Sequence, residues 1–261
     1  MVKNSEQIKR EWALILGGST GLGLATAKKL ASKGYSIIIV HRDRRLVLPA
    51  IEEQFALIRG VGVQCISFNI DATNAVKQGE VIQSIKELFK EEDAIKVVVH
   101  SIAKGNVKTI HELEEQDFQL TIDAMGTSLF TWVKKLLKAE ILCADCRVIA
   151  FTSEGNTKAI PNYAAVSAAK VVLESITRNM AIALAPYSIK VNCIQAGVTD
   201  TASLNRIPNS ELLKEEAIRR NPYGRLTTVE DVANAAYLLT MEEASWITGT
   251  TIKVDGGESL Q

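Results

Sequence analysis

A tyrosine and a lysine lie seven positions apart in the stretch NYAAVSAAK, residues 162–170. In an α-helix, residues seven apart differ by only about 20° around the axis, so Tyr163 and Lys170 would lie on one face. A phenol can donate a hydrogen bond to an oxygen that gains negative charge, and a nearby ammonium favours that charge. The pair therefore predicts a site that stabilises a developing oxyanion, provided that a helix carries it.

A second group with chemical meaning is the glycine-rich stretch GGSTGLG, residues 17–23. It follows an apolar run and precedes a helical pattern, so backbone N–H groups can approach a pyrophosphate at the positive end of the helix. Glycines also serve tight turns and close helix packing, but this place after the first predicted strand favours a dinucleotide site. The predicted cofactor contacts in this turn are Gly17, Ser19, Thr20, Gly21, Leu22 and Gly23.

The stretch HRDRR, residues 41–45, follows the second predicted strand and bears on cofactor choice. A carboxylate there commonly receives a ribose 2′-hydroxyl, whereas a 2′-phosphate calls for arginine. Asp43 thus argues for NADH, and Arg42, Arg44 and Arg45 argue for NADPH. Because Arg42 lies nearest the strand end, we expect NADPH; NADH is the less favoured alternative, and a solvated charge run is another.

Alternating strands and helices are predicted to position these groups. Short apolar runs read as buried strands over 12–17, 35–40, 61–68, 94–101, 146–151, 188–194 and 250–255. Apolar residues recur at helical spacing over 23–34, 50–60, 75–92, 117–142, 163–185 and 228–240. Regular alternation predicts an α/β fold, a single doubly wound parallel sheet of the Rossmann type with helices on both faces. No linker or repeat divides the chain, so residues 1–261 are expected to form one domain.

Composition limits the classes of partner that the protein is expected to bind. Thirty basic residues balance thirty acidic ones among 261, so no net charge favours nucleic acid or an anionic membrane. The first twelve residues are polar and no apolar run approaches the length of a membrane span, so we expect a cytoplasmic protein with a small-molecule partner. The pair Cys143 and Cys146 suits a redox or zinc site, but it has no matching second pair, so we expect buried structural thiols and no metal.

These motifs together resemble the short-chain dehydrogenase/reductase family over nearly the whole chain. Three residues separate Gly17 from Gly21, as in that family, and NPYGR, EDVANAAYLL and GTTIKVDGG resemble its C-terminal third. Most members have Tyr-x3-Lys, but residue 166 here is valine, and the spacing Tyr-x6-Lys is that of the enoyl-acyl carrier protein reductases. VVHSIA at 98–103 also resembles that subgroup, where most of the family has Asn-Asn-Ala-Gly.

The resemblance implies an activity and a set of roles. An enoyl reductase delivers hydride from NADPH to the β-carbon of a 2-enoyl thioester, carried by acyl carrier protein or coenzyme A. Tyr163 would donate to the enolate oxygen, and Lys170 would hold the nicotinamide ribose. Asp71 would contact the adenine, and the remaining cofactor contacts implied by the family are Ser101, Thr199 and Thr201.

One departure keeps an alternative open. Ser153 lies seventeen residues before Lys170, where ketone-reducing members carry their catalytic serine and many enoyl reductases have a second tyrosine. The NADPH-using enoyl reductases of Gram-positive bacteria, which this chain resembles, also lack that tyrosine. A 3-oxoacyl-type carbonyl reductase is therefore the alternative, although the helix asparagine of ketone reductases is absent from TIDAMGT. A catalytically silent dinucleotide sensor is a further alternative, against which both Tyr163 and Lys170 count.

Two surfaces are expected to have further roles. The amphipathic stretch 202–221 follows a predicted cofactor strand and is interpreted as a mobile lid over the acyl chain. The last predicted strand has no helix after it to cover its edge, and the helix over 163–185 carries a second apolar series with Val171 and Ile182. Such surfaces are usually buried against another copy of the chain, and the family resemblance implies a homotetramer.

Overall fold

Seven parallel strands form one sheet in the computed structural model, which describes residues 1–4, 6 and 8–261. The strands are β1 (Arg10–Leu16), β2 (Ser36–His41), β3 (Cys65–Asn69), β4 (Asp93–His100), β5 (Leu142–Ser153), β6 (Lys190–Ala196) and β7 (Thr251–Val254). Their order across the sheet is β3-β2-β1-β4-β5-β6-β7. The predicted Rossmann-type sheet is therefore confirmed, and each predicted strand overlaps an observed one.

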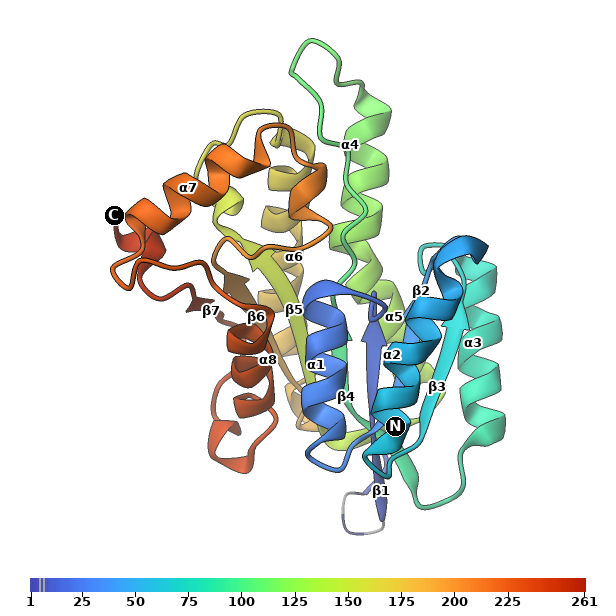
Figure 1. Ribbon diagram of the computed structural model, residues 1–261. Helices are drawn as coiled ribbons and strands as arrows, with labels where there is room; N and C mark the ends of the chain where they lie inside the picture. The colour runs from blue at the N-terminus through green and yellow to red at the C-terminus, as the bar shows by residue number, and fades with distance from the viewer. Residues whose placement is uncertain (5, 7) are drawn as a thin grey trace.

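Helices cover both faces of this sheet (Figure 1). They are α1 (Gly21–Ala31), α2 (Leu48–Gly60), α3 (Ala75–Leu88), α4 (Glu115–Ile122), α5 (Ser128–Lys138), α6 (Ala164–Ala183), α7 (Ser210–Arg220) and α8 (Val229–Leu238). Side chains of α1, α2 and α8 pack on one face, and those of α3, α5 and α6 pack on the other. None of the helices in the described part of the chain has the length and apolar composition that a membrane span needs.

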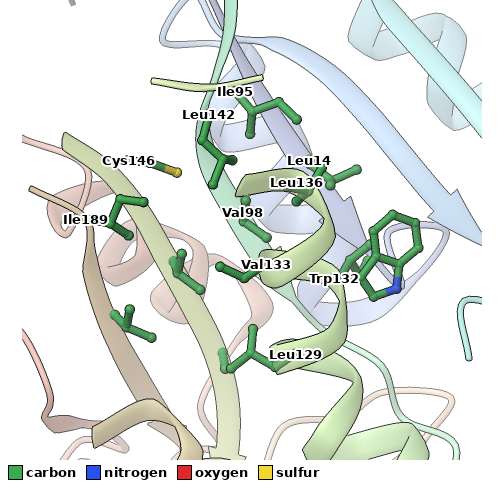
Figure 2. Packing of buried hydrophobic residues seen from close by; sticks show 14 of the residues in the cluster. Leu14, Ile95, Val98, Leu129, Trp132, Val133, Leu136, Leu142, Cys146 and Ile189 are labelled. Carbon is green, nitrogen blue, oxygen red and sulfur yellow. The ribbon is translucent and has the colours of Figure 1, made fainter. Parts of the chain in front are cut away.

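The strands are buried on both faces, which explains why they read as nearly continuous apolar runs. Leu14 of β1 and Val98 of β4 face α5, where they meet Trp132 and Val133 (Figure 2). The next residues along these strands face the opposite core with α1, α2 and α8. This period of two is what allows one short strand to anchor two layers of helices.

The helical pattern predicted over 117–142 corresponds to helical backbone over 115–138, within which one turn has π-helical hydrogen bonding. The structure has α4 and α5 joined by a π-helical turn over Asp123–Thr127. The hydroxyls of Thr127 and Ser128 donate to the carbonyl oxygens of Asp123 and Ala124, at 3.4 and 2.7 Å. Such side-chain bonds give the backbone carbonyls an alternative partner and accompany a widened turn.

The same span also ends too late, because β5 begins at Leu142 rather than at residue 146. Leu142 pairs with Ile95, and the register then shifts around Asp145, whose φ is 62°. Cys143 and Cys146 thus lie within β5 as buried free thiols, and burial raises the pKa of each. The prediction of structural thiols is confirmed, and the described residues gather no group of three His, Cys, Asp or Glu side chains suited to a metal ion.

Candidate functional site

The glycine-rich turn lies between β1 and α1 at the carboxyl end of the sheet, where the strand order reverses between β1 and β4. A Cβ on Gly23 would lie 2.1 Å from the Gly17 carbonyl oxygen, and one on Gly17 would lie 2.5 Å from that of Ser101. Gly17 also has a φ of +88°. A side chain is therefore excluded at Gly17 and at Gly23, and the backbone of the turn is pressed against the end of β4.

The start of α1 is open to a ligand. Thr20 precedes the helix in an extended conformation, is exposed, and makes no side-chain cap. The first backbone N–H groups of α1 can therefore donate hydrogen bonds to a ligand. Ser19 and Leu22 are half-buried in the same turn. A pyrophosphate fits such a turn because glycine backbone and a helix N-terminus converge on it. The residues present therefore fit a dinucleotide.

The loop after β6 faces this turn. A Cβ on Gly21 would lie 3.5 Å from Cγ2 of Thr201, so the two predicted contacts oppose each other. The Thr201 hydroxyl accepts a hydrogen bond from the backbone N–H of Leu204 at 3.2 Å. Thr199 is buried, and its hydroxyl donates to the Gly197 carbonyl at 2.9 Å. Of this pair, Thr201 is the one placed beside the glycine turn.

Charged residues gather after β2 and β3, where the sequence predicts the adenosine end of the cofactor. Arg42 donates to Asp71 Oδ2 at 2.9 Å, and Lys104 donates to the same oxygen at 3.1 Å. Burial alone would raise the pKa of Asp71, but hydrogen bonds from Thr73 and the Lys104 ammonium outweigh it and lower that pKa to about 2. Sequence reasoning missed Lys104; its only signal was its place three residues after Ser101.

The Asp43 carboxylate is turned away from this group. Its Oδ2 lies 2.8 Å from Nδ1 of His41, whose side chain is 4% exposed. Its backbone N–H donates to the Asn69 side chain at 2.9 Å. Arg42, in contrast, has a side chain that is 63% exposed. Both residues are therefore paired within the protein, and Arg42 is the more exposed of the two.

Tyr163 and Ser153 form the centre of the site. β5 ends at Ser153, and Tyr163 is the residue immediately before α6. Their hydroxyl oxygens lie 3.4 Å apart. Burial raises the pKa of Tyr163, while the hydrogen bond with Ser153 acts in the opposite direction. The phenol therefore stays protonated and can donate.

Lys170 approaches the same strand end from about two turns further along α6. Its ammonium donates to the Phe151 carbonyl at 2.6 Å, two residues before Ser153. Burial lowers the pKa of Lys170 to about 8, with Cys193 and Glu174 acting in the opposite direction. Tyr163 and Lys170 thus both reach the end of β5, as the spacing predicts, although Tyr163 precedes the helix instead of lying within it. Two ammonium protons remain for a ligand.

Val166 and His100 lie close to the site but supply no acid or base to it. Val166, four residues before Lys170, is buried, and its Cγ2 would lie 2.5 Å from a Cβ on Gly105, so this position is filled by apolar packing. His100 is buried, and its Nε2 lies 2.7 Å from the Ser128 hydroxyl. Burial, with a smaller effect of the Lys170 charge, lowers the pKa of His100 to about 3, so the imidazole is neutral and structural.

Comparisons with known proteins agree with this geometry. A family model described as Enoyl-(Acyl carrier protein) reductase matches residues 17–259. The 3-oxoacyl-[acyl-carrier-protein] reductase FabG of Staphylococcus epidermidis is 28% identical over 245 residues, which cover 94% of this chain and 97% of that protein. This similarity favours the carbonyl-reducing alternative over the enoyl-reducing hypothesis drawn from the Tyr-x6-Lys spacing.

Solved structures share the fold. An enoyl-[acyl-carrier-protein] reductase (NADH) from Aquifex aeolicus has a TM-score of 0.85 at 24% identity, covering 98% of both chains. A short chain dehydrogenase from Burkholderia cenocepacia in complex with NADP has a TM-score of 0.84 at 22% identity, covering 95% of this chain and 98% of that one. At these identities the likeness concerns the fold alone.

Proposed function

Because the chain belongs to the short-chain dehydrogenase/reductase family, we propose that it reduces the 3-oxo group of an acyl thioester with NADPH. The observation that carries this proposal is the pair of hydroxyls of Ser153 and Tyr163, 3.4 Å apart at the end of β5. Two donors at this spacing can both reach one substrate oxygen. The similarity to a 3-oxoacyl-[acyl-carrier-protein] reductase supports an acyl thioester, with acyl carrier protein as the expected carrier.

Each residue has a defined task in this reaction. NADPH, when bound, supplies the hydride that the carbonyl carbon accepts. Ser153 donates a hydrogen bond to the carbonyl oxygen, and Tyr163 donates a second bond and gives its proton as the charge develops. One proton of the Lys170 ammonium is bonded to the Phe151 carbonyl, and the other two hold the ribose hydroxyls. The positive charge of the ammonium also favours the oxyanion. The glycine turn and the start of α1 hold the pyrophosphate.

Enoyl reduction is the second candidate, and a specific observation favours it. Tyr163 lies one turn earlier than the tyrosine of most family members, and Val166 occupies the usual position. The π-helical turn, DAMGT, also lacks the asparagine of ketone reductases. In this reaction the β-carbon accepts the hydride, and the same two hydroxyls would hold the thioester oxygen as it becomes an enolate.

Substrate comparison tests both candidates in one assay. Acetoacetyl and crotonyl thioesters, on coenzyme A and on acyl carrier protein, are supplied with NADPH, and products are identified by mass spectrometry. Preferential reduction of the acetoacetyl thioester supports the proposal. Preferential reduction of the crotonyl thioester replaces it by the enoyl candidate. NADPH binding without turnover of either would indicate a silent sensor.

The preference for NADPH rests on the arrangement after β2. The Asp43 carboxylate is paired with the buried His41, whereas the exposed Arg42 can reach a 2′-phosphate. A charge-assisted contact of this kind contributes roughly 1.5–3 kcal/mol. NADH remains the alternative if Asp43 leaves His41.

The apolar surface supports assembly into a homotetramer. β7 is an edge strand, and Trp246, just before it, is 97% exposed. Beside it lies an apolar cavity of about 360 Å³, lined by residues that include Leu238, Met241 and Ile247. On α6, Ile182 is 79% exposed. Light scattering at micromolar concentration should give a mass near four chains; full activity at 28.5 kDa, the mass of one chain, would contradict assembly.

A further inference from the structure

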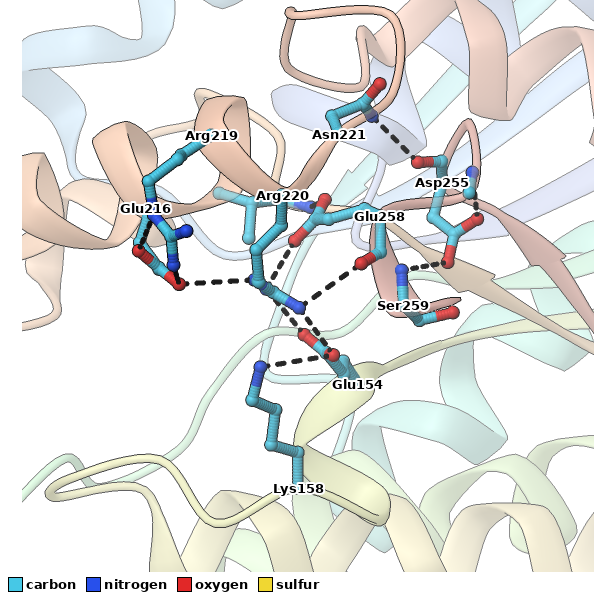
Figure 3. Close-up of polar contacts among 12 residues, drawn as sticks. Glu154, Lys158, Glu216, Arg219, Arg220, Asn221, Asp255, Glu258 and Ser259 are labelled. Carbon is cyan, nitrogen blue, oxygen red and sulfur yellow. Dashed lines mark hydrogen bonds and ion pairs between the residues drawn. The ribbon is translucent and has the colours of Figure 1, made fainter. Parts of the chain in front are cut away.

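A buried ion cluster lies at the C-terminal end of α7, formed by Arg220, Glu154 and Glu258 (Figure 3). The two terminal nitrogens of Arg220 donate to the two carboxylate oxygens of Glu154, each at 2.9 Å. One of them also donates to Glu258 Oε1 at 2.8 Å. Arg220 is 9% exposed and Glu258 is 2% exposed. A single guanidinium therefore holds two carboxylates that are far apart in the sequence.

Through Glu154, the cluster is linked to the hydroxyls of Ser153 and Tyr163. Glu154 lies between Ser153 and Gly155, and both of these neighbours touch Tyr163. Ser153 contributes the hydroxyl 3.4 Å from that of Tyr163. A Cβ on Gly155 would lie 2.6 Å from Cε1 of the Tyr163 ring, so the backbone is pressed against the ring. Holding Glu154 therefore fixes the strand end that sets the distance between the two donors.

Through Glu258, the cluster is linked to the loop after β6, where the cofactor is expected to bind. The Oε2 of Glu258 accepts the backbone N–H of Val198 at 3.0 Å, at the start of the loop that carries Thr201. Arg220 also donates to the Glu258 carbonyl at 3.3 Å. Beside the cluster, Asn221 donates to the Asp255 carbonyl at 3.0 Å. The end of α7 is thereby tied to the body of the protein, so we expect any movement of the predicted lid over 202–221 in its earlier part.

We propose that Arg220 is a positioning residue of the reductase site: it joins the end of α7, the Ser153 donor and the loop carrying Thr201 into one rigid unit. The proposal rests on the proposed function. Only arginine suits this position, because its planar fork serves two carboxylates at once, whereas lysine offers one point charge. Substrate contacts made by the earlier part of α7 would thus be transmitted to the hydroxyls and to the cofactor loop.

Arg220→Lys tests this role while keeping the buried charge, and Arg219→Lys is its matched control. Arg219 lies on the same helix, but its side chain is 72% exposed and pairs with Glu216. Because a displacement of about 1 Å can lower a rate 10²-fold, we expect Arg220→Lys to lower kcat roughly 10- to 100-fold. Arg219→Lys should leave kcat unchanged. Equal kcat and equal NADPH affinity in the two variants would overturn the proposal.

Single-arm variants separate positioning from a loss of folding. Glu154→Gln should lower kcat while NADPH affinity stays within twofold, and Glu258→Gln should weaken NADPH binding. These two variants decide the matter if Arg220→Lys does not fold. Losses that only follow the folded fraction, measured by circular dichroism, would show a merely structural cluster and reject the proposal.

A spectroscopic readout keeps the test independent of turnover. Carbon-13 at Cζ of tyrosine reports the Tyr163 hydroxyl, whose resonance is identified by its absence in Tyr163→Phe. We expect Arg220→Lys and Glu154→Gln to shift this resonance, and Arg219→Lys to leave it in place. An unshifted resonance in the first two variants would contradict positioning. If the wild-type protein reduces no thioester, the proposed function fails, but this measurement still decides the role of Arg220.

Discussion

Tyr163→Phe should abolish most of the turnover while leaving the fold and the cofactor site intact. The substitution removes only the hydroxyl that lies 3.4 Å from that of Ser153, and the ring remains packed on Gly155. Loss of one donor to a developing oxyanion typically lowers kcat by about 10²- to 10³-fold, or about 2.7–4 kcal/mol. If Tyr163 also gives the proton, the loss should lie at the upper end.

The effect on stability should be much smaller than the effect on rate. A neutral hydrogen bond contributes about 0.5–1.5 kcal/mol net, and a separation of 3.4 Å is at the long limit for such a bond. Denaturant unfolding should therefore change by about 1 kcal/mol or less. NADPH affinity, followed by fluorescence, should stay within twofold because no cofactor contact is removed.

Steady-state NADPH oxidation measures the loss, with Tyr187→Phe as the matched control. Tyr187 lies after α6 and is 37% exposed, so the same chemical change there should leave kcat unaltered. Ser153→Ala should also lower kcat, and the double variant should lose less than the product of the single losses, because both hydroxyls serve one oxygen. A Tyr163→Phe enzyme within twofold of wild type would refute the reasoning.

Three further changes test the cofactor side. Above about pH 7 the 2′-phosphate keeps its full charge, so the Lys170 ammonium can be followed there by itself. Wild-type NADPH affinity should fall as the pH rises through the Lys170 pKa of about 8, because the buried ammonium then loses its proton. Lys170→Met should bind NADPH more weakly and lack this fall; fluorescence titration measures both, and a flat wild-type profile in this range would contradict the assignment. Arg42→Ala should remove a preference for NADPH over NADH of about 10- to 100-fold, measured as the ratio of kcat/KM, and a wild-type preference for NADH would instead identify Asp43 as the ribose ligand. Gly23→Ala should abolish NADPH binding, since its Cβ would lie 2.1 Å from the Gly17 carbonyl oxygen. Gly79→Ala in α3 is the control, because the space around its Cβ is open, and it should bind NADPH normally. Its free energy of unfolding in denaturant should rise by up to about 1 kcal/mol.

Features governed by local spacing could be predicted from the sequence. The glycine turn, the order of strands and helices, and the shared direction of Tyr163 and Lys170 depend on residues a few positions apart. Periods of 2 and 3.6 carry that information directly. The same reasoning did not reveal the π-helical turn at Asp123–Thr127, where hydroxyl bonds to the backbone accompany a wider helix. It failed at Leu142, because strand pairing with Ile95 decides where β5 begins.

Features governed by packing could not be predicted. The sequence leaves Asp43 and Arg42 as rivals, and only the burial of His41 turns the carboxylate away from the ligand side. Lys104 meets Asp71 from 33 positions away, and Arg220 meets Glu154 from 66. No periodicity links residues at such separations, so the ion pairs that surround the site become visible only when the chain is folded.

The position of the tyrosine and the identity of residue 153 favour different substrates. Tyr163 directly precedes α6, three residues before Val166, a separation of about 4.5 Å along a helix axis, so the phenol would lie further from a ribose held by Lys170. That displacement suits an enoyl thioester, in which the oxygen lies three bonds from the carbon that accepts hydride. Ser153, however, places a second donor 3.4 Å from the phenol, as reduction of a carbonyl requires. If both reactions use the same oxygen site, they differ in the distance from that oxygen to the carbon that accepts hydride. Ser153→Ala should therefore lower acetoacetyl reduction more than crotonyl reduction, since only the carbonyl oxygen lies directly on the reacting carbon, and an equal loss with both thioesters would show that one oxygen geometry serves both.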